Sequence, residues 1–188
     1  NAYNVAVGSN AGQNVTTGIY NTLTGGLAGD ALTDADYNVA TGYLALTADT
    51  LGSRSVAIGA VALAAQNFTT ATDAYNVAVG AFAGAAVTTG IVNTLIGGLA
   101  GDSLTDADNN VVVGYAALAT DTLGSRSTAI GTAALRFQNF TTATDTYNVA
   151  VGFNAGNAVT TGISNTIIGG RAGDALTDAD FNVAIGMD

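Results

Sequence analysis

The stretch Ser55–Ala64, SVAIGAVALA, is one copy of a phrase that recurs along the whole chain. Each copy begins with Asn or Ser, and the copies begin at intervals of 17, 17, 17 and then 21 residues. Every copy has Gly at its fifth place, and the ten full copies have Ala at the eighth. The first residues of the copies are Asn4, Asn21, Asn38, Ser55, Asn76, Asn93, Asn110, Ser127, Asn148, Asn165 and Asn182. So short and regular a period indicates a solenoid of stacked coils.

A longer period of 72 residues groups these coils. Residues 4–75 and 76–147 are identical at 53 of 72 positions, and a partial third copy runs over residues 148–188. The 21-residue coils carry their extra residues in QNFTTATD, at residues 66–73 and 138–145. We therefore treat residues 1–188 as one elongated domain of about ten coils. Because the chain starts and stops inside the phrase and lacks an initiator Met, we expect it to be a piece of a longer protein.

The residue types of the phrase predict an all-β, parallel β-solenoid. Strictly phased Val and Ile argue against low-complexity disorder, and the frequent Gly argues against a helical repeat. In a stacked coil, equivalent residues lie about 4.8 Å apart. The Asn/Ser column should then form an internal hydrogen-bonded ladder. The Gly column should mark a corner with positive φ or closely approaching backbones, and the Ala column a place where the coil is thin.

The strand segment of the phrase has two different faces. Val56 and Ile58 point to one side, whereas Ser55, Ala57 and Gly59 point to the other. Hydrophobic residues make up 48% of the chain, more than one thin coil can hide. We therefore expect the rod to associate along its length, with Val56 and Ile58 facing a partner coil or chain.

The composition excludes several classes of function. A net charge of −10 with only four Arg as cations argues against a nucleic-acid partner and against binding to an anionic membrane surface. No apolar stretch is long enough to span a membrane. The absence of Cys excludes disulfides and thiolate metal sites. Without His, Cys, Lys or Glu, and with every Asp cluster repeated, we expect no enzyme, no catalytic residue and no cofactor.

The phrases SVAIGAVALA and STAIGTAAL resemble the YadA-like head repeats of trimeric autotransporter adhesins. NTLIGGLAG and NVVVGYAAL are also similar to repeats of phage tail fibres that carry the same head motif. The resemblance extends over nearly every coil, although the coils of that family are shorter than 17 residues. It implies a left-handed β-roll, a parallel homotrimer, and an extracellular location on a virion tail fibre or a bacterial surface. The role it implies is attachment to a host-surface glycan or protein receptor.

The acidic motif GDALTDAD, at residues 29–36, returns at 101–108 and 173–180. In an extended segment Asp34 and Asp36 would face the same way, and Asp49 of the next coil could approach them as oxygen ligands of Ca²⁺. The spacing matches no calcium motif, so we favour a solvated turn whose Asp residues cap backbone amides, with no metal. Asp30, Asp34, Asp36, Asp49 and Asp73 should also keep the rod soluble.

Arginine and threonine offer two further candidate sites. Arg54 and Arg126 lie in LGSRS. They could contact an anion or a glycan, but we favour an ion pair with an Asp such as Asp36 or Asp108. The column of Thr at the thirteenth place could order water as an ice-binding surface, but we favour an internal ladder, because no second Thr column accompanies it. The column comprises Thr16, Thr33, Thr50, Thr88, Thr105, Thr122, Thr160 and Thr177.

Two columns of aromatic residues have open roles at this stage. The sixth place carries Tyr43, Tyr115 and Phe153, and the last place of several coils carries Tyr20, Tyr37, Tyr75 and Tyr147. These rings could stack on sugars, clamp one coil to the next, or fill a seam between chains. We expect a structural or adhesive fibre segment. The alternative is a single-chain solenoid that binds ice or glycans, and the residues that would contact a ligand are unknown.

Overall fold

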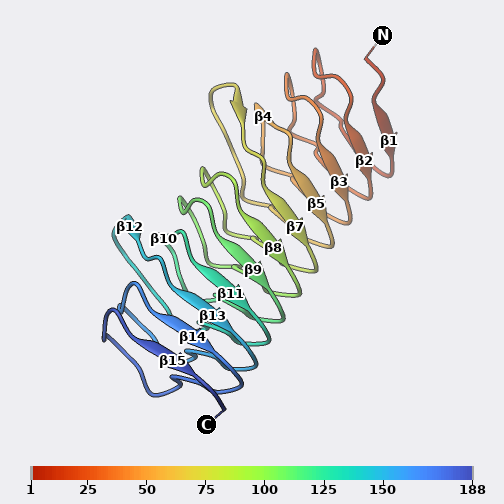
Figure 1. Ribbon diagram of the computed structural model, residues 1–188. Coiled ribbons are helices and arrows are strands. Elements are labelled where there is room, and N and C mark those ends of the chain that lie inside the picture. Colours follow the sequence, from red (N-terminus) through yellow and green to blue (C-terminus); the bar gives the residue numbers. More distant parts are fainter. Residues whose placement is uncertain (1, 188) are drawn as a thin grey trace.

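The computed structural model describes residues 2–187 as a rod of stacked coils, with the two termini at opposite ends (Figure 1). The described residues contain no helix, and every strand pair is parallel. The predicted all-β parallel solenoid is therefore confirmed. Each coil contributes one three-residue strand, and the rest of the coil consists of turns.

One 11-stranded sheet runs the length of the rod in the order β1-β2-β3-β5-β7-β8-β9-β11-β13-β14-β15. Two short pairs, β4 with β6 and β10 with β12, join each 21-residue coil to the coil before it. The strands of the long sheet are β1 (Val5–Val7), β2 (Thr22–Thr24), β3 (Val39–Thr41), β5 (Val56–Ile58), β7 (Val77–Val79), β8 (Thr94–Ile96), β9 (Val111–Val113), β11 (Thr128–Ile130), β13 (Val149–Val151), β14 (Thr166–Ile168) and β15 (Val183–Ile185). The short strands are β4 (Gly52–Ser53), β6 (Thr72–Asp73), β10 (Gly124–Ser125) and β12 (Thr144–Asp145).

The register of the long sheet keeps equivalent residues opposite one another. Val56 of β5 opposes Val39 and Val77, and Ile58 opposes Thr41 and Val79. The 21-residue coils preserve this register, because their extra residues lie in the loop before the next strand. A one-residue slip would turn every side chain to the other face, so each coil fixes the alignment of the next.

The fifth-place glycines form the predicted corner. Gly97, for example, has a φ of +132°, and a Cβ built on it would lie 2.5 Å from the carbonyl oxygen of Gly114 in the next coil. Both reasons given for this column, positive φ and close approach of backbones, therefore apply at once.

The core of the rod is filled by alternating large and small residues. The eighth-place alanines, such as Ala45 and Ala62, are fully buried, which confirms that the coil is thin there. The middle strand residue and the ninth residue of a coil take turns as the larger one. Leu23 packs beside Gly29, whereas Ala40 shares its coil with Leu46.

The first-place asparagines form the predicted internal ladder. The backbone N–H of Asn38 donates to Oδ1 of Asn21 (2.9 Å), and the N–H of Ser55 donates to Oδ1 of Asn38 (2.8 Å). The side-chain amide of each Asn also donates to a carbonyl in the turn ahead, as Asn21 does to Ala35 (2.7 Å). Such fully bonded buried amides tie each coil to its neighbours.

Candidate functional site

The strands present their bulky side chains to solvent. Ala57 is fully buried, whereas Ile58 is 39% exposed and Val56 is half-buried. We call the residues at the first and third strand positions the outer face. The interior of the coil accepts the smaller side chains, so the β-branched ones are left outside.

The outer face consists only of β-branched residues. Its 22 positions hold Val, Ile or Thr, with no charge. β-Branched side chains have one strongly preferred χ1 rotamer in many settings, so the face is stiff as well as regular. Its six threonines, whose hydroxyls make no side-chain hydrogen bond among the described residues, are Thr22, Thr24, Thr41, Thr94, Thr128 and Thr166.

A column of residues two positions before each strand borders one side of this face. We call it the leading column. Tyr3, Tyr20 and Tyr37 stack on one another with ring centroids 5.3 and 5.0 Å apart. The guanidinium of Arg54 follows, 5.0 Å from the ring of Tyr37 and 5.7 Å from that of Tyr75. These ring faces are occupied by one another, so the tyrosines clamp coil to coil and expose edges rather than faces to a ligand.

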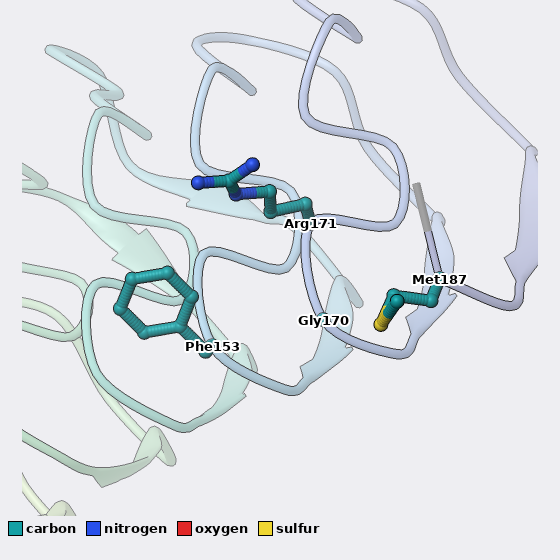
Figure 2. A pocket seen from close by; sticks show the side chains of 4 residues that line it. All are labelled: Phe153, Gly170, Arg171 and Met187. Carbon is teal, nitrogen blue, oxygen red and sulfur yellow. The ribbon is translucent and has the colours of Figure 1, made fainter.

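A second column, two positions after each strand, borders the other side. We call it the trailing column, and it holds Tyr43, Tyr115, Phe153 and Met187 among small residues. Tyr43 and Tyr115 lie against Gly26 and Gly98 of the preceding coil. Near the C-terminal end, Phe153 and Met187 flank Gly170 and, with Arg171, line a hollow of about 370 Å³ (Figure 2). The hollow is open because glycine supplies no side chain between the two walls.

The outer face and its two bordering columns together collect the exposed apolar residues. Of the 22 large hydrophobic side chains exposed in the described chain, 20 lie in these four columns; the others are Phe82 and Phe137. No Asp lies there, and the only charged residues are Arg54 and Arg126. We call this combined area the apolar surface. Continuous exposed apolar patches of this kind mark interaction sites.

The acidic motif is a set of capping turns. Asp36 accepts a hydrogen bond from the N–H of Ile19 (2.8 Å), and Asp108 does so from Ile91 (2.8 Å). Asp34 accepts one from the hydroxyl of Thr17 (2.5 Å). The preferred interpretation as amide-capping turns is confirmed for Asp36 and Asp108. No group of three or more acidic residues in the described chain could hold a metal ion.

The expectation for Asp49 was wrong. This carboxylate is fully buried rather than on the surface beside Asp34 and Asp36. It accepts hydrogen bonds from the N–H groups of Gly52 (3.0 Å) and Phe68 (3.1 Å) and from Nε2 of Gln66 (2.6 Å). Burial raises the pKa of Asp49, although these hydrogen bonds oppose the rise.

Sequence reasoning missed the polar network around Gln66. Its amide donates to Ser55 (3.0 Å) as well as to Asp49, and its Oε1 accepts from Asn76 (2.9 Å). Gln138 repeats this arrangement with Asp121, Ser127 and Asn148. Gln therefore bridges the Asn ladder where Ser, too short to reach the next coil, replaces Asn. The signal was present, because Ser at the first place occurs only in the coils that contain this Gln.

The arginines of LGSRS form ion pairs, as favoured, but with other partners than those suggested. Nε of Arg54 lies 2.9 Å from Asp73 and Nε of Arg126 lies 2.9 Å from Asp145. Asp36 and Asp108 receive only the backbone N–H of these arginines, on their carbonyls. The hydrogen bond and the charge of Asp73 raise the pKa of Arg54.

The thirteenth-place threonines form a ladder between coils. The hydroxyl of Thr33 donates to the carbonyl of Thr50 (3.1 Å), and Thr105 does the same to Thr122 (3.0 Å). These side chains are half-buried or exposed rather than internal. Because their hydroxyls are already engaged, this column is a poor candidate for ordering water.

The chain resembles no known family by comparison. No family model, curated protein or solved structure matches it. Among residues 2–187 there is no helix long and apolar enough to cross a membrane. The candidate functional site is therefore the apolar surface, identified from its geometry alone.

Proposed function

We propose that the chain is a rigid segment of an extracellular attachment fibre in which three copies pack side by side through the apolar surface. The observation that carries this proposal is the gathering of 20 of 22 exposed large hydrophobic residues on one side of the rod. An apolar surface that runs the whole length of a rod is best covered by a partner of equal length, and a second copy of the chain is such a partner.

The size of the surface supports self-association. The eleven strands span about 48 Å, and the seven residues from the leading to the trailing column span about 20 Å. The resulting outline of about 1,000 Å² exceeds the roughly 800 Å² that each partner contributes to a standard interface. The lack of Asp on this surface removes the repulsion that two copies with a net charge of −10 would otherwise meet.

The internal bonding of the rod suits a fibre. Backbone hydrogen bonds, the Asn ladder and the stacked tyrosines connect each coil to the next. A stiff rod holds several weak contacts in register, so that avidity replaces the affinity of a single site. The resemblance to adhesin heads and tail fibres supports attachment to a host glycan or protein, on a virion or a bacterial surface, without catalysis or membrane insertion by this segment.

Sedimentation equilibrium tests the assembly. We expect three times the chain mass of 18.4 kDa. Ile96→Asp places a carboxylate at a position that is 38% exposed in the single chain, so the variant should fold but sediment as a monomer. Thr70→Asp, in an exposed loop far from the apolar surface, should leave the trimer intact. A wild-type monomer would contradict the proposed assembly.

Glycan arrays test the attachment role. The wild type and Thr70→Asp should bind at least one surface glycan, and Ile96→Asp should bind it about tenfold more weakly, because a monomer loses avidity. Binding by none of the three proteins would contradict attachment to glycans through this segment. Equal binding by all three would contradict the multivalent mechanism.

Ice binding is a second candidate, and the outer face favours it. Two columns of stiff β-branched residues with free threonine hydroxyls lie at regular spacing on one sheet. This surface differs from the thirteenth-place column that the sequence suggested. A monomeric wild type that shows thermal hysteresis, with loss of the hysteresis in Ile96→Asp but not in Thr70→Asp, would support ice binding over the fibre.

A further inference from the structure

We propose that the leading column of one copy packs against the trailing column of the next copy at the same strand, so that the copies run parallel and in register. This inference rests on the proposed function for the existence of the assembly. It goes further by fixing the orientation of the copies and naming the residues that meet.

The outer face is too narrow to form the interface by itself. Three strand residues span about 10 Å, and over about 48 Å this gives roughly 480 Å² per copy, well below the 800 Å² or so of a standard interface. The bordering columns supply the missing area. They also hold the aromatic residues and arginines, the types that protein interfaces favour.

Symmetry decides which columns meet. Rotation about an axis parallel to the rod, as in a trimer, brings the leading column of one copy to the trailing column of the next and keeps equal strands level. A two-fold axis perpendicular to the rod reverses one copy and brings like columns together. The two arrangements therefore produce different neighbours for each residue of the leading column.

The arginines favour the parallel arrangement. An antiparallel pair centred on β8 places Arg54, two strands before β8, opposite Arg126 of the other copy, two strands after it. Two like charges would then be brought together at the edge of an interface. In the parallel arrangement Arg54 lies level with Ala60 of the neighbour, and Arg126 with Thr132. These small residues leave room for the long side chains.

The aromatic residues of the trailing column also find suitable partners. Tyr43 borders β3, whose leading residue is Tyr37, and Phe153 borders β13, whose leading residue is Tyr147. The faces of the Tyr37 ring are taken by Tyr20 and Arg54. Its free edge can therefore meet the ring of Tyr43 from the neighbouring copy in an edge-to-face contact.

Cysteine cross-linking at β8 tests the arrangement, because the chain has no cysteine of its own. Val92 in the leading column is 44% exposed. Gly98 in the trailing column has no positive φ, and an added Cβ would meet nothing closer than 3.5 Å. Within one chain the two positions lie about 20 Å apart along the strand, too far for a disulfide.

The parallel arrangement predicts that Val92→Cys/Gly98→Cys forms covalent trimers under mild oxidation, whereas each single variant stays uncross-linked. The control Val92→Cys/Thr70→Cys should also stay uncross-linked. Disulfide-linked dimers of Val92→Cys alone would overturn the proposal, because the centred antiparallel pair brings Val92 to Val92. So would a double variant that sediments as a trimer yet forms no disulfide. If every variant and the wild type sediment as monomers, the proposed assembly itself fails.

Discussion

At the scale of single residues, Ala119 occupies a position where an equivalent coil has a hydrogen-bond donor. In the earlier coil the hydroxyl of Thr47 donates to Asp30 (2.5 Å). The matching carboxylate, Asp102, has a buried Oδ1 without a hydrogen-bond partner, and burial raises its pKa. Ala119→Thr should therefore stabilise the fold by about 1 kcal/mol, and Thr47→Ala should destabilise it by a similar amount. Urea unfolding at one protein concentration measures both, and an unchanged or lower stability of Ala119→Thr would contradict the assignment.

A second prediction at this scale concerns Asp49 and pH. Because burial raises its pKa above the ordinary 3.8, the folded protein binds this proton more tightly than the unfolded chain does. The free energy of unfolding should therefore fall as pH rises through 3.8 towards the folded pKa, and stay lowered above it. Asp49→Asn should remove this fall, so that its stability changes less from about pH 3 to about pH 7.

The level of stability should also drop in Asp49→Asn at every pH, because the new amide faces the amide of Gln66, and two donors cannot bond. Urea unfolding across a pH series separates slope from level. A variant with the pH slope of the wild type would show that Asp49 is ionised as readily in the folded protein as in the unfolded chain.

At the scale of the coil, adjacent glycines at each corner have different roles. Gly97 combines a φ of +132° with a backbone neighbour 2.5 Å from its missing Cβ, whereas Gly98 has open space up to the ring of Tyr115 at 3.5 Å. Gly97→Ala should thus destabilise the protein by about 3 kcal/mol, and Gly98→Ala by less than about 0.5 kcal/mol. Thermal and urea unfolding of the pair provide the measurement. Equal effects would mean that the corner is able to relax.

Much of each coil could be predicted because the constraint is repeated. The strand, the Gly corner, the thin Ala place and the Asn ladder recur in coil after coil, so their columns are visible in one sequence. The inward face of the strand could not be read from Val56, Ala57 and Ile58, because both sets are apolar. Only the thinness of the closed coil decides it, by admitting Ala57 and excluding the larger pair.

The buried position of Asp49 was beyond prediction for a different reason. An Asp is most often exposed, and its burial depends on a donor, Gln66, that lies in the following coil. The apolar surface was likewise only half visible. The alternation of Val56 and Ile58 indicated an apolar face, but the joining of that face with the tyrosine columns depends on how the chain turns before and after each strand.

At the scale of the whole molecule, charge and apolar area are separated. The net charge of −10 belongs to the acidic turns, whereas the apolar surface contains no Asp. Assembly of three copies therefore brings the acidic sides of the rods closer without forming ion pairs between Asp residues and the seam. Added salt should screen this repulsion and leave the apolar contacts intact.

The association of copies should consequently tighten as NaCl is raised from about 0.02 M to about 0.5 M, since the Debye length falls several-fold over that range. Sedimentation velocity over a dilution series at each salt concentration measures the dissociation constant. Thr70→Asp, which adds acidic charge outside the seam, should show a steeper dependence on salt than the wild type. Weaker association at high salt would instead mean that ion pairs, such as those open to Arg54 and Arg126, hold the copies together. The apolar surface would then not be the seam.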